Sequence, residues 1–380
     1  MNQSQTLSVR EGQRKLASIQ QVTQLSPIKN ADKIELATIE GWKAIVTKGD
    51  FSVGDKGVYF EIDSFLPLEA RYQFLAKSSK KENPYTHTMG YRIRTRKMRN
   101  QISQGLLMPL KAFPELDGTD AVGTDVTLKL GVEKYYVPEI KGNFGLRKGD
   151  FPIQFTEKTD EQRLQSHLDY LQEFANQEYY ISTKIDGTSL TLIKHHNEIR
   201  MASRNEEIDI NNSWIYDLFV LRTGLEQKLQ QLPYADVVLQ GEFYGEKIAK
   251  NRLGIKGNKW AVFTVQVNYQ RVGLIKALNI SQQLGLTFVP IEEVGTQDQH
   301  KINQLIALGI NSQQIKKQPF DYSLNDLLKK AEGFYPNGSK KEGIVVRELN
   351  DTKNDRHNVA AGHFLSFKVL NNQYLLKNKD

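Results

Sequence analysis

The chain of 380 residues contains no cysteine. This absence excludes disulfide bonds, thiolate zinc sites and a cysteine nucleophile. No apolar run approaches the ~18 residues that a helix needs to cross a bilayer. The start of the chain, MNQSQTLSVREGQRK, is polar and charged and shows no secretory signal. These absences predict a cytoplasmic protein without a membrane partner.

What the chain does contain is typical of a folded protein: 39% of its residues are hydrophobic and 25% are charged. Its length predicts two domains. The formal net charge is +7. An excess of this size suits a polyanionic partner such as nucleic acid, although charge alone does not establish one.

The first part of the chain, residues 1–140, predicts short strands separated by glycine and aspartate turns. The candidate strands are residues 16–25, 42–49, 56–65, 91–98 and 125–132. About five short strands without a long helix predict a small β-barrel, and the OB-fold is the favoured one.

Three arginines alternate in the candidate strand YRIRTRKM: Arg92, Arg94 and Arg96. In a strand they would share one face. That face could contact phosphate or nucleic acid. Equally, it could be a solvated sheet edge that resists aggregation.

Residues 141–152 are rich in glycine and charge and are predicted to be a linker. The second domain, residues 153–380, begins with TDEQRLQSHLDYLQEFANQ, whose spacing predicts a helix with Thr159 as N-cap and Gln162 completing a capping box. Strands alternating with helices are expected beyond it, at residues 199–205, 236–245, 260–267, 342–349 and 363–370. Together the two parts predict an α+β protein.

The stretch YYISTKIDGTSLTLI, residues 179–193, allows two interpretations. Asp186 and Gly187 between two β-like runs are a strong hairpin signal, and Lys184 would then be a solvated strand residue. Alternatively, Lys184 is a nucleophile. The sequence K-x-D-G is too short to decide between them.

Four segments each place polar residues within or at the end of a β-like run. These residues are Lys184 with Asp186, then Glu242, Glu342 and Lys368. Taken singly, each is more simply a solvated strand end, or a lysine that snorkels from a sheet edge. Their order carries more information, because an arginine in SRN and an aromatic strand, WAVFTV, lie between them.

This combination resembles the covalent nucleotidyltransferase superfamily of ligases and capping enzymes. KIDG resembles its nucleophile motif, and SRN its ribose- and phosphate-contacting motif. The resemblance assigns catalysis to Lys184 and Lys368, and nucleotide contacts to Gly187, Arg204, Phe263 and Ile344, with Phe263 stacking on the base and Ile344 beneath it. The superfamily often has K-x-K in its fifth motif. Here the sequence is Ser366-Phe367-Lys368, so only Lys368 carries this role.

The order of domains selects a branch of the superfamily. DNA ligases and capping enzymes carry an OB domain after the fifth motif, whereas here only twelve residues follow Lys368. Nearly the whole chain resembles the ATP-dependent RNA ligases with an N-terminal OB domain, the Naegleria type. The resemblance implies an OB-fold barrel followed by an adenylyltransferase domain of antiparallel sheets flanked by helices. Residues 349–363 look longer than this branch requires and are expected to form a surface loop.

The resemblance also implies a reaction. ATP would leave AMP on Lys184, and an adenylated 5′ end would then join RNA with 3′-OH and 5′-phosphate ends, in RNA repair. Mg²⁺ or Mn²⁺ would be held by oxygen ligands, partly through waters, from Asp186, Glu242 and Glu342. Lys158 and Arg163 could meet phosphate or simply decorate the predicted helix. The protein is expected to be a monomer. The alternatives are a non-catalytic RNA- or tRNA-binding protein and a DNA ligase.

Overall fold

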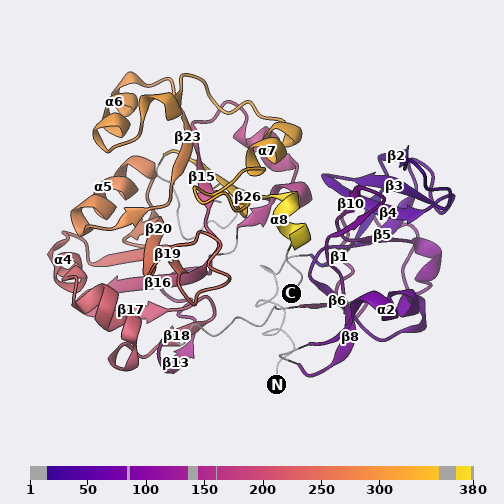
Figure 1. Cartoon of the computed structure of the whole chain (residues 1–380), viewed down its shortest axis with the longest axis horizontal. Coiled ribbons are helices and arrows are strands. Elements are labelled where there is room, and N and C mark those ends of the chain that lie inside the picture. Colours follow the sequence, from indigo (N-terminus) through magenta and orange to yellow (C-terminus); the bar gives the residue numbers. More distant parts are fainter. Residues whose placement is uncertain (1–14, 84–85, 136–143, 160, 351–364, 378–380) are drawn as a thin grey trace. The chain divides into compact units, whose positions relative to one another are not determined.

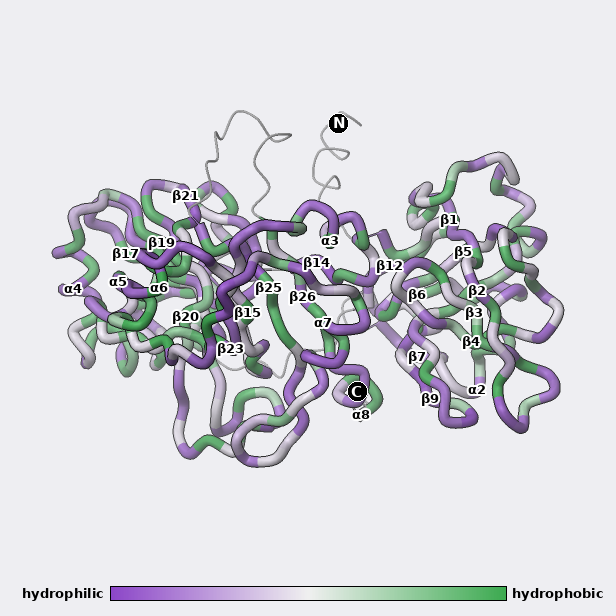
Figure 2. Tube along the Cα trace, turned by 90° about the horizontal axis from the view of Figure 1, so that it is seen from above, coloured by the Kyte–Doolittle hydropathy of each residue, from purple (hydrophilic) through white to green (hydrophobic). Residues whose placement is uncertain are grey.

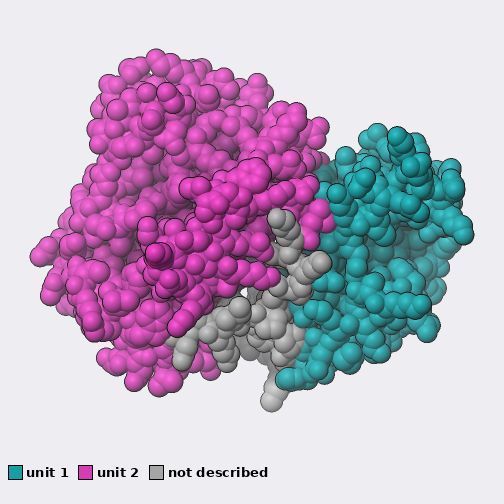
Figure 3. Space-filling model, in the orientation of Figure 1, with its two compact units in different colours: residues 1–138, 378–380 teal, residues 139–377 magenta. Residues whose placement is uncertain are grey.

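The computed structural model describes residues 15–83, 86–135, 144–159, 161–350 and 365–377. The chain divides into two compact units, residues 1–138 with 378–380 and residues 139–377, which Figure 3 colours separately. Most of the predicted loop at 349–363 lies outside the described residues. Among the described residues, no helix is both long and apolar enough to span a bilayer.

Unit 1 is built from short, mostly antiparallel strands, shown in indigo and purple in Figure 1. In its described residues the strands form the sheets β1-β5-β11, β2-β3-β4, β12-β6-β8-β7 and β10-β9. Their bounds are β1 Ala17–Gln21, β2 Gln24–Pro27, β3 Ile34–Ile39, β4 Trp42–Thr47, β5 Lys56–Phe60, β6 Ser64–Leu66, β7 Lys80–Glu82, β8 Met89–Arg92, β9 Arg96–Met98, β10 Gln101–Ser103, β11 Leu106–Pro109 and β12 Glu133–Lys134. The short helices are η1 Ala70–Leu75, α2 Ala76–Ser79 and η2 Leu110–Ala112.

Aromatic side chains fill the core of this unit. Phe60 packs edge-on against Tyr72 with ring centroids 5.8 Å apart, and Phe113 lies 5.9 Å from Phe60. The strand predicted at residues 42–49 is present as β4. The segments predicted at 16–25 and 56–65 are extended, but each breaks into two strands in different sheets, β1 with β2 and β5 with β6.

The strand predicted at residues 125–132 is wrong. Apart from an isolated bridge between Asp125 and Ser18, this segment forms turns. The Leu130 N–H donates to the Val126 carbonyl over 3.0 Å, which coils the backbone. Val126 and Leu130 are nevertheless buried in the core. The apolar spacing of residues 125–132 therefore predicted correctly which side chains are buried, but it predicted the wrong backbone conformation.

The continuous strand predicted at residues 91–98 is also wrong, because β8 ends at Arg92 and β9 begins at Arg96. The three arginines therefore do not line one face. Arg92 is buried, pairs with Asp63 at 3.1 Å and lies 4.5 Å from the Tyr135 ring centroid. Arg96 donates to the Ser78 carbonyl and the Ser79 hydroxyl. Arg94 is partly buried.

Unit 2 contains two large sheets. In the described residues the first runs β13-β18-β17-β16-β19-β20-β21, with β22 parallel to β20, and the second runs β14-β26-β25-β15-β23-β24. The first comprises β13 Arg147–Asp150, β16 Thr188–His195, β17 Glu198–Ala202, β18 Glu206–Ile208, β19 Asp236–Gly245, β20 Asn258–Val267, β21 Gln270–Arg271 and β22 Thr287–Phe288. The second comprises β14 Gln162–Arg163, β15 Tyr179–Lys184, β23 Ile291–Gly295, β24 Ile315–Lys316, β25 Gly343–Glu348 and β26 Ser366–Leu370.

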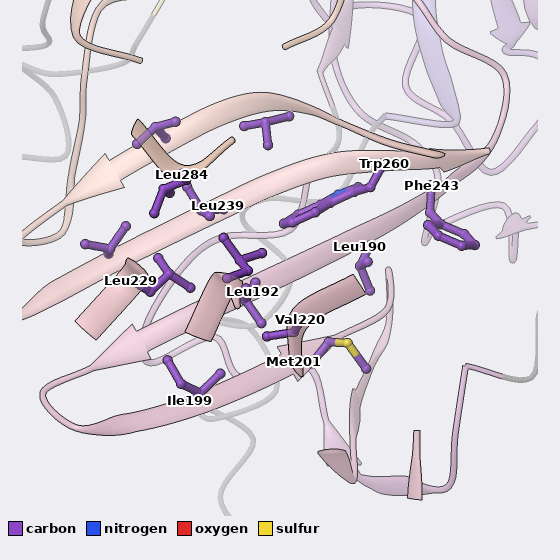
Figure 4. Close-up of a cluster of buried hydrophobic side chains, with 14 of the residues drawn as sticks. Leu190, Leu192, Ile199, Met201, Val220, Leu229, Leu239, Phe243, Trp260 and Leu284 are labelled. Atoms are coloured by element: carbon purple, nitrogen blue, oxygen red, sulfur yellow. The ribbon is translucent and has the colours of Figure 1, made fainter. Parts of the chain in front are cut away.

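Helices cover the apolar faces of these sheets. They are α3 Asp169–Phe174, α4 Leu225–Gln231, α5 Leu274–Leu284, α6 Gln299–Ala307, α7 Leu324–Ala331 and α8 Asn372–Lys377, with short turns η3 Leu164–Ser166, η4 Ile210–Asn212 and η6 Ser312–Gln314 and a π-helix η5 Tyr216–Leu221. Figure 4 shows Leu192 of β16 and Leu239 of β19 packing with Leu229 of α4 and Leu284 of α5. Figure 2 shows hydrophobic residues along β25 and β26 in the second sheet, where Val346 and Phe367 are fully buried.

The hairpin alternative for residues 179–193 is wrong. Strand β15 pairs with β23 and β25, whereas β16 pairs with β17 and β19. Asp186 and Gly187 therefore carry the chain from the second sheet to the first. A residue at the end of β15 lies where the chain crosses between the two sheets.

The helix predicted to start at Thr159 is wrong as well. Residues Gln162–Arg163 pair in parallel with Phe367–Lys368, and helix α3 starts only at Asp169. Pairing with β26 overrides the helical spacing of this segment. Thr159 shares a hydrogen bond of 3.0 Å with the Ser189 hydroxyl instead. Part of the predicted linker also differs, because Arg147–Asp150 forms β13 and pairs with β18.

Candidate active site

The second sheet places Lys184 and Lys368 on one face. Lys184 lies opposite Gly343, and Lys368 lies opposite Val345. Because side chains alternate along a strand, Lys184, Val345 and Lys368 project to the same side. Both lysines are partly buried.

Ile344 projects to the opposite face, so its predicted place beneath the base is wrong. It is fully buried in a core with Phe174, Ile181 and Phe367. Its neighbour Val345 is 8% exposed and shares the face of Lys184. The motif order identified the correct segment, but not which of its side chains lies on the face of Lys184.

The first sheet contributes Glu242 and Phe263. In β19, Glu242 lies opposite Ser189 of β16 and Ala261 of β20. The pairing of β19 with β20 shifts register between Gln240 and Gly241, which leaves Phe263 without a direct partner, as in a β-bulge. Phe263 packs beside Ile185 and Tyr244.

Arg347 joins the two sheets. Its Nη1 donates to the Phe263 carbonyl over 2.5 Å, and its guanidinium lies 5.4 Å from the Phe263 ring centroid. Glu161 pairs with the guanidinium at 2.6 Å and accepts from the Ser366 hydroxyl at 2.5 Å. Burial raises the pKa of Glu161, but Arg347 and Arg271 outweigh it and lower that pKa to about 2. The ion pair therefore stays charged at neutral pH and holds Phe263 against the face of Lys184.

Lys184 is paired with an acid. Its Nζ lies 2.8 Å from Glu342 Oε1, and the two side chains are 24% and 16% exposed. Burial alone would lower the pKa of Lys184, but Glu342, Glu242 and Asp186 outweigh burial and raise that pKa. Without a further cation, the protein therefore holds this lysine as an ammonium ion.

The acids Asp186 and Glu242 near Lys184 have raised pKa values. Burial, followed by the charge of Glu342, raises the pKa of Asp186, although Arg252 pairs with it at 2.8 Å. Burial raises the pKa of Glu242 to about 8, with Glu342 and Asp186 adding to the effect and Lys184 opposing it. Buried carboxyl groups that resist ionisation favour an added cation nearby.

A divalent cation fits this donor set, with one restriction. Carboxylate oxygens are the ligands that Mg²⁺ and Mn²⁺ prefer, and Mg²⁺ usually keeps several waters. Among the described His, Asp and Glu side chains, no group of three or more is close enough to hold a metal directly. Asp186, Glu242 and Glu342 therefore fit a cation that retains waters or is also held by a ligand's phosphates.

Cation affinity should depend on pH through Glu242. Because its pKa is raised to about 8, Glu242 is neutral below that pH and must lose its proton to attract a cation. Mn²⁺ affinity is expected to rise with pH up to about 8 and to level off above it, with proton release on binding at pH 7. Calorimetry in two buffers of different ionisation enthalpy measures the released protons. The Glu242→Gln variant should lose this release, and its persistence there would contradict the assignment.

One tyrosine ties the backbone around Lys184 and Glu342. The Tyr335 hydroxyl donates to the Lys184 carbonyl over 2.7 Å and accepts from the Glu342 N–H over 3.1 Å. Asn371 holds the same segment, because the Glu342 carbonyl accepts its N–H at 2.9 Å and the Lys341 carbonyl its side-chain amide at 3.0 Å. Tyr335 and Asn371 thus hold the backbone at the point where the hydrogen-bonded pairing of β15 with β25 ends.

Replacing Tyr335 by phenylalanine should separate positioning from binding. The change leaves the Lys184 carbonyl and the Glu342 amide short of a partner, and a small displacement of a reacting group can cost up to ~100-fold in rate. The maximal rate of the predicted nucleotide transfer to Lys184 is expected to fall ~10-fold or more, with little change in the KM for nucleotide. A change confined to thermal stability would show that Tyr335 only supports the fold.

Close packing against strand β19 requires a glycine at position 187. A Cβ there would lie 2.4 Å from the Phe243 carbonyl and 3.0 Å from Glu242 Cγ. The glycine thus lets the connection from β15 to β16 approach the strand that carries Glu242. Any larger residue would displace that acid.

The other predicted residues are spread around this centre. Arg204 is exposed, yet near enough to Glu242 to lower its pKa. Lys158 donates to the Asn205 side chain at 3.3 Å. Arg163 lies beside Lys368 in the parallel pairing of β14 with β26.

Sequence reasoning missed Arg252, Tyr335 and the pair of Arg347 with Glu161. Arg347 and Glu161 stand in segments that carry other motif residues, EGIVVR and KTDEQR. The charge of Arg347 within a predicted strand was the available signal, whereas Glu161 stood in a segment predicted to be a helix. Arg252 and Tyr335 lie in loops and gave none.

Comparison with known proteins agrees with this geometry. A family profile described as RNA ligase matches residues 177–369, and a profile described as an OB-fold domain matches residues 16–110. Comparison with curated protein sequences gives no match.

Several solved structures of Naegleria gruberi RNA ligase are similar to the chain over nearly its whole length. A lysine-to-methionine mutant with AMP and Mn is 31% identical with a TM-score of 0.81, covering 97% of this chain and 100% of that one. A lysine-to-alanine mutant with ATP and Mn is 30% identical with a TM-score of 0.80, covering 96% and 99%. The same ligase with PPi is 32% identical with a TM-score of 0.79, covering 97% and 100%.

These matches favour an enzyme over a non-catalytic RNA-binding protein, and an RNA ligase over a DNA ligase. The order of the two profiles along the chain is the order of the two units. The chain therefore belongs to the RNA ligase family, whose members are ATP-dependent nucleotidyltransferases, and it carries an N-terminal OB-fold domain.

Proposed function

We propose that this ligase seals RNA with 3′-OH and 5′-phosphate ends through a lysyl-AMP intermediate on Lys184. The observation that carries the proposal is the convergence of Lys184 with Glu342, Glu242 and Asp186, while Lys368 shares its face of the sheet. The solved Naegleria ligase structures with ATP, AMP, Mn and PPi support it, because these are the reactant, product and metal of such a step.

In the first step, the Lys184 amine attacks the α-phosphorus of ATP. A nitrogen–phosphorus bond forms, the bond to the β-phosphate oxygen breaks, and pyrophosphate leaves. Lys184 must first lose the proton that the surrounding acids favour. Asp186, Glu242 and Glu342 would hold Mg²⁺ or Mn²⁺, which when bound lowers the lysine pKa and neutralises phosphate charge.

The nucleotide would lie on the face that Lys184 shares with Val345 and Lys368. Phe263 would stack on adenine from the first sheet, and Val345, in place of Ile344, would support it from the second. Lys368 and Arg204 would contact phosphate or ribose. These contacts orient the α-phosphate toward the Lys184 amine.

In the second step, a 5′-phosphate oxygen of RNA attacks the phosphorus of lysyl-AMP, and the lysine amine leaves. In the third, the 3′-OH attacks the activated 5′-phosphate and AMP leaves. Electrostatic stabilisation by Lys368 and Arg204 would serve each transfer. We further propose a role in RNA repair by a cytoplasmic monomer.

The proposal is tested in two stages. Incubation with α-labelled ATP and Mn²⁺ or Mg²⁺ is expected to leave label on the protein after denaturation. A panel of 5′-phosphate substrates, nicked and single-stranded, RNA and DNA, is then scored for joining, with RNA joined best. Absence of the label, or joining of DNA alone, would refute the proposed reaction.

A further inference from the structure

The connection between β19 and β20, together with the first two residues of β20, concentrates positive charge. Residues 246–259, named the basic loop here, hold one acidic and five basic residues: Glu246, Lys247, Lys250, Arg252, Lys256 and Lys259. Their net charge is +4, in a chain whose formal net charge is +7. The four lysines are exposed to solvent.

The basic loop has a fixed conformation. Ile248 is buried, and the Asn251 side chain donates to the Ile255 carbonyl at 3.0 Å and accepts its N–H at 3.1 Å. The Asn258 amide donates to the Glu246 carbonyl over 2.8 Å. The lysines therefore project from a backbone that is already ordered, which reduces the entropy cost of binding a partner.

The basic loop is anchored beside the site. Arg252 pairs with Asp186 at 2.8 Å, two residues after Lys184. The Arg252 carbonyl accepts from the Asn337 amide at 2.7 Å and from the Ser339 hydroxyl. Arg252 thus attaches the loop to the connection that follows Lys184.

We propose that the basic loop binds the phosphate backbone of RNA next to the end being joined. The inference rests on the proposed function, because a 5′-phosphate that attacks AMP on Lys184 must approach the anchor of this loop. Phosphates on either side of that end then come within reach of its exposed lysines. Lysine ammonium groups bind phosphate without reading sequence, so binding by this loop is expected not to depend on the RNA sequence.

The test compares two variants with the same reduction in charge. The loop variant carries Lys247→Gln, Lys256→Gln and Lys259→Gln. The control carries Lys316→Gln, Lys317→Gln and Lys329→Gln, which are exposed residues on or beside β24 and on α7. Affinity for a nicked RNA duplex with a 5′-phosphate at the nick is measured without ATP over a range of salt.

The loop variant is expected to bind this RNA ~10-fold or more weakly than the control at ~0.1 M salt. Its log–log salt slope should fall by up to ~0.9 for each RNA phosphate that the loop no longer neutralises. Equal affinity and slope in the two variants would overturn the proposal, whether the loop then binds nothing or an acidic protein. Lysyl-AMP formation is assayed separately, and its absence from the unmodified protein would refute the proposed function while leaving the RNA measurement valid.

A cross-linking experiment locates the site of RNA binding. Because the chain has no cysteine, Lys256→Cys creates a single attachment point for a photoactivatable group. Cross-links are expected at nucleotides flanking the nick. An even distribution along the duplex would place the loop away from the joined end and contradict the inference.

Discussion

Lys184→Ala is expected to abolish lysyl-AMP formation and, with it, ligation from ATP. Loss of a covalent nucleophile removes a chemical step, so the rate should fall by at least ~10³-fold. Among the described lysines, Lys184 is the one that pairs with Glu342, and Glu242 and Asp186 also act on its charge. Label from α-labelled ATP on the denatured protein measures the step directly.

Two controls separate chemistry from folding. Lys184→Arg keeps a cation opposite Glu342, but a guanidinium is not deprotonated in proteins and cannot attack. It should fold and still fail to form the adduct. Both variants should slowly seal a pre-adenylated nick, because that step needs no nucleophilic lysine. Normal labelling of either variant would show that another residue accepts AMP.

Some segments rich in β-branched, aliphatic and aromatic residues were predictable from the sequence. Residues 236–245 were expected to be a strand and form β19 with those bounds. The motif order also singled out Lys184, Glu242 and Glu342, which the structure brings near one another. These features depend on local pattern and on a motif order shared with a known family.

Features that depend on distant pairing were not predictable. The hairpin alternative at Asp186 fails because β15 pairs with β23 and β25, which lie more than a hundred residues away in the chain. Arg92 was expected on an exposed face, either for binding or as a solvated sheet edge, but it is buried and contacts Asp63 and Tyr135. The local sequence pattern indicates that a segment is extended or apolar. Only the pairing register of the strands determines which residues it contacts.

The same limit explains Ile344. Its segment was identified correctly, and either Ile344 or Val345 has the chemistry to support a base. Which one faces Lys184 is set by the pairing of Lys184 with Gly343, two residues that lie 159 positions apart in the chain. One step along a strand moves a side chain to the other face.

Glu342→Gln is expected to lower the rate of lysyl-AMP formation by at least ~100-fold, the scale on which removal of an electrostatic catalytic group slows an enzyme. The reason is the cation that Glu342 would help to hold. The structure makes the test sharp because Glu342 also raises the pKa of Lys184. Removing its charge should make the lysine easier to deprotonate while making the enzyme slower.

Two measurements therefore move in opposite directions. In the absence of metal, reaction of Lys184 with an amine-selective reagent should shift to lower pH in Glu342→Gln, since an ion pair at 2.8 Å no longer favours the ammonium form. At the same time, more Mn²⁺ should be required for AMP transfer, with the maximal rate still reduced. If AMP transfer instead became faster, Glu342 would only restrain the lysine, and the carboxylates would need another role.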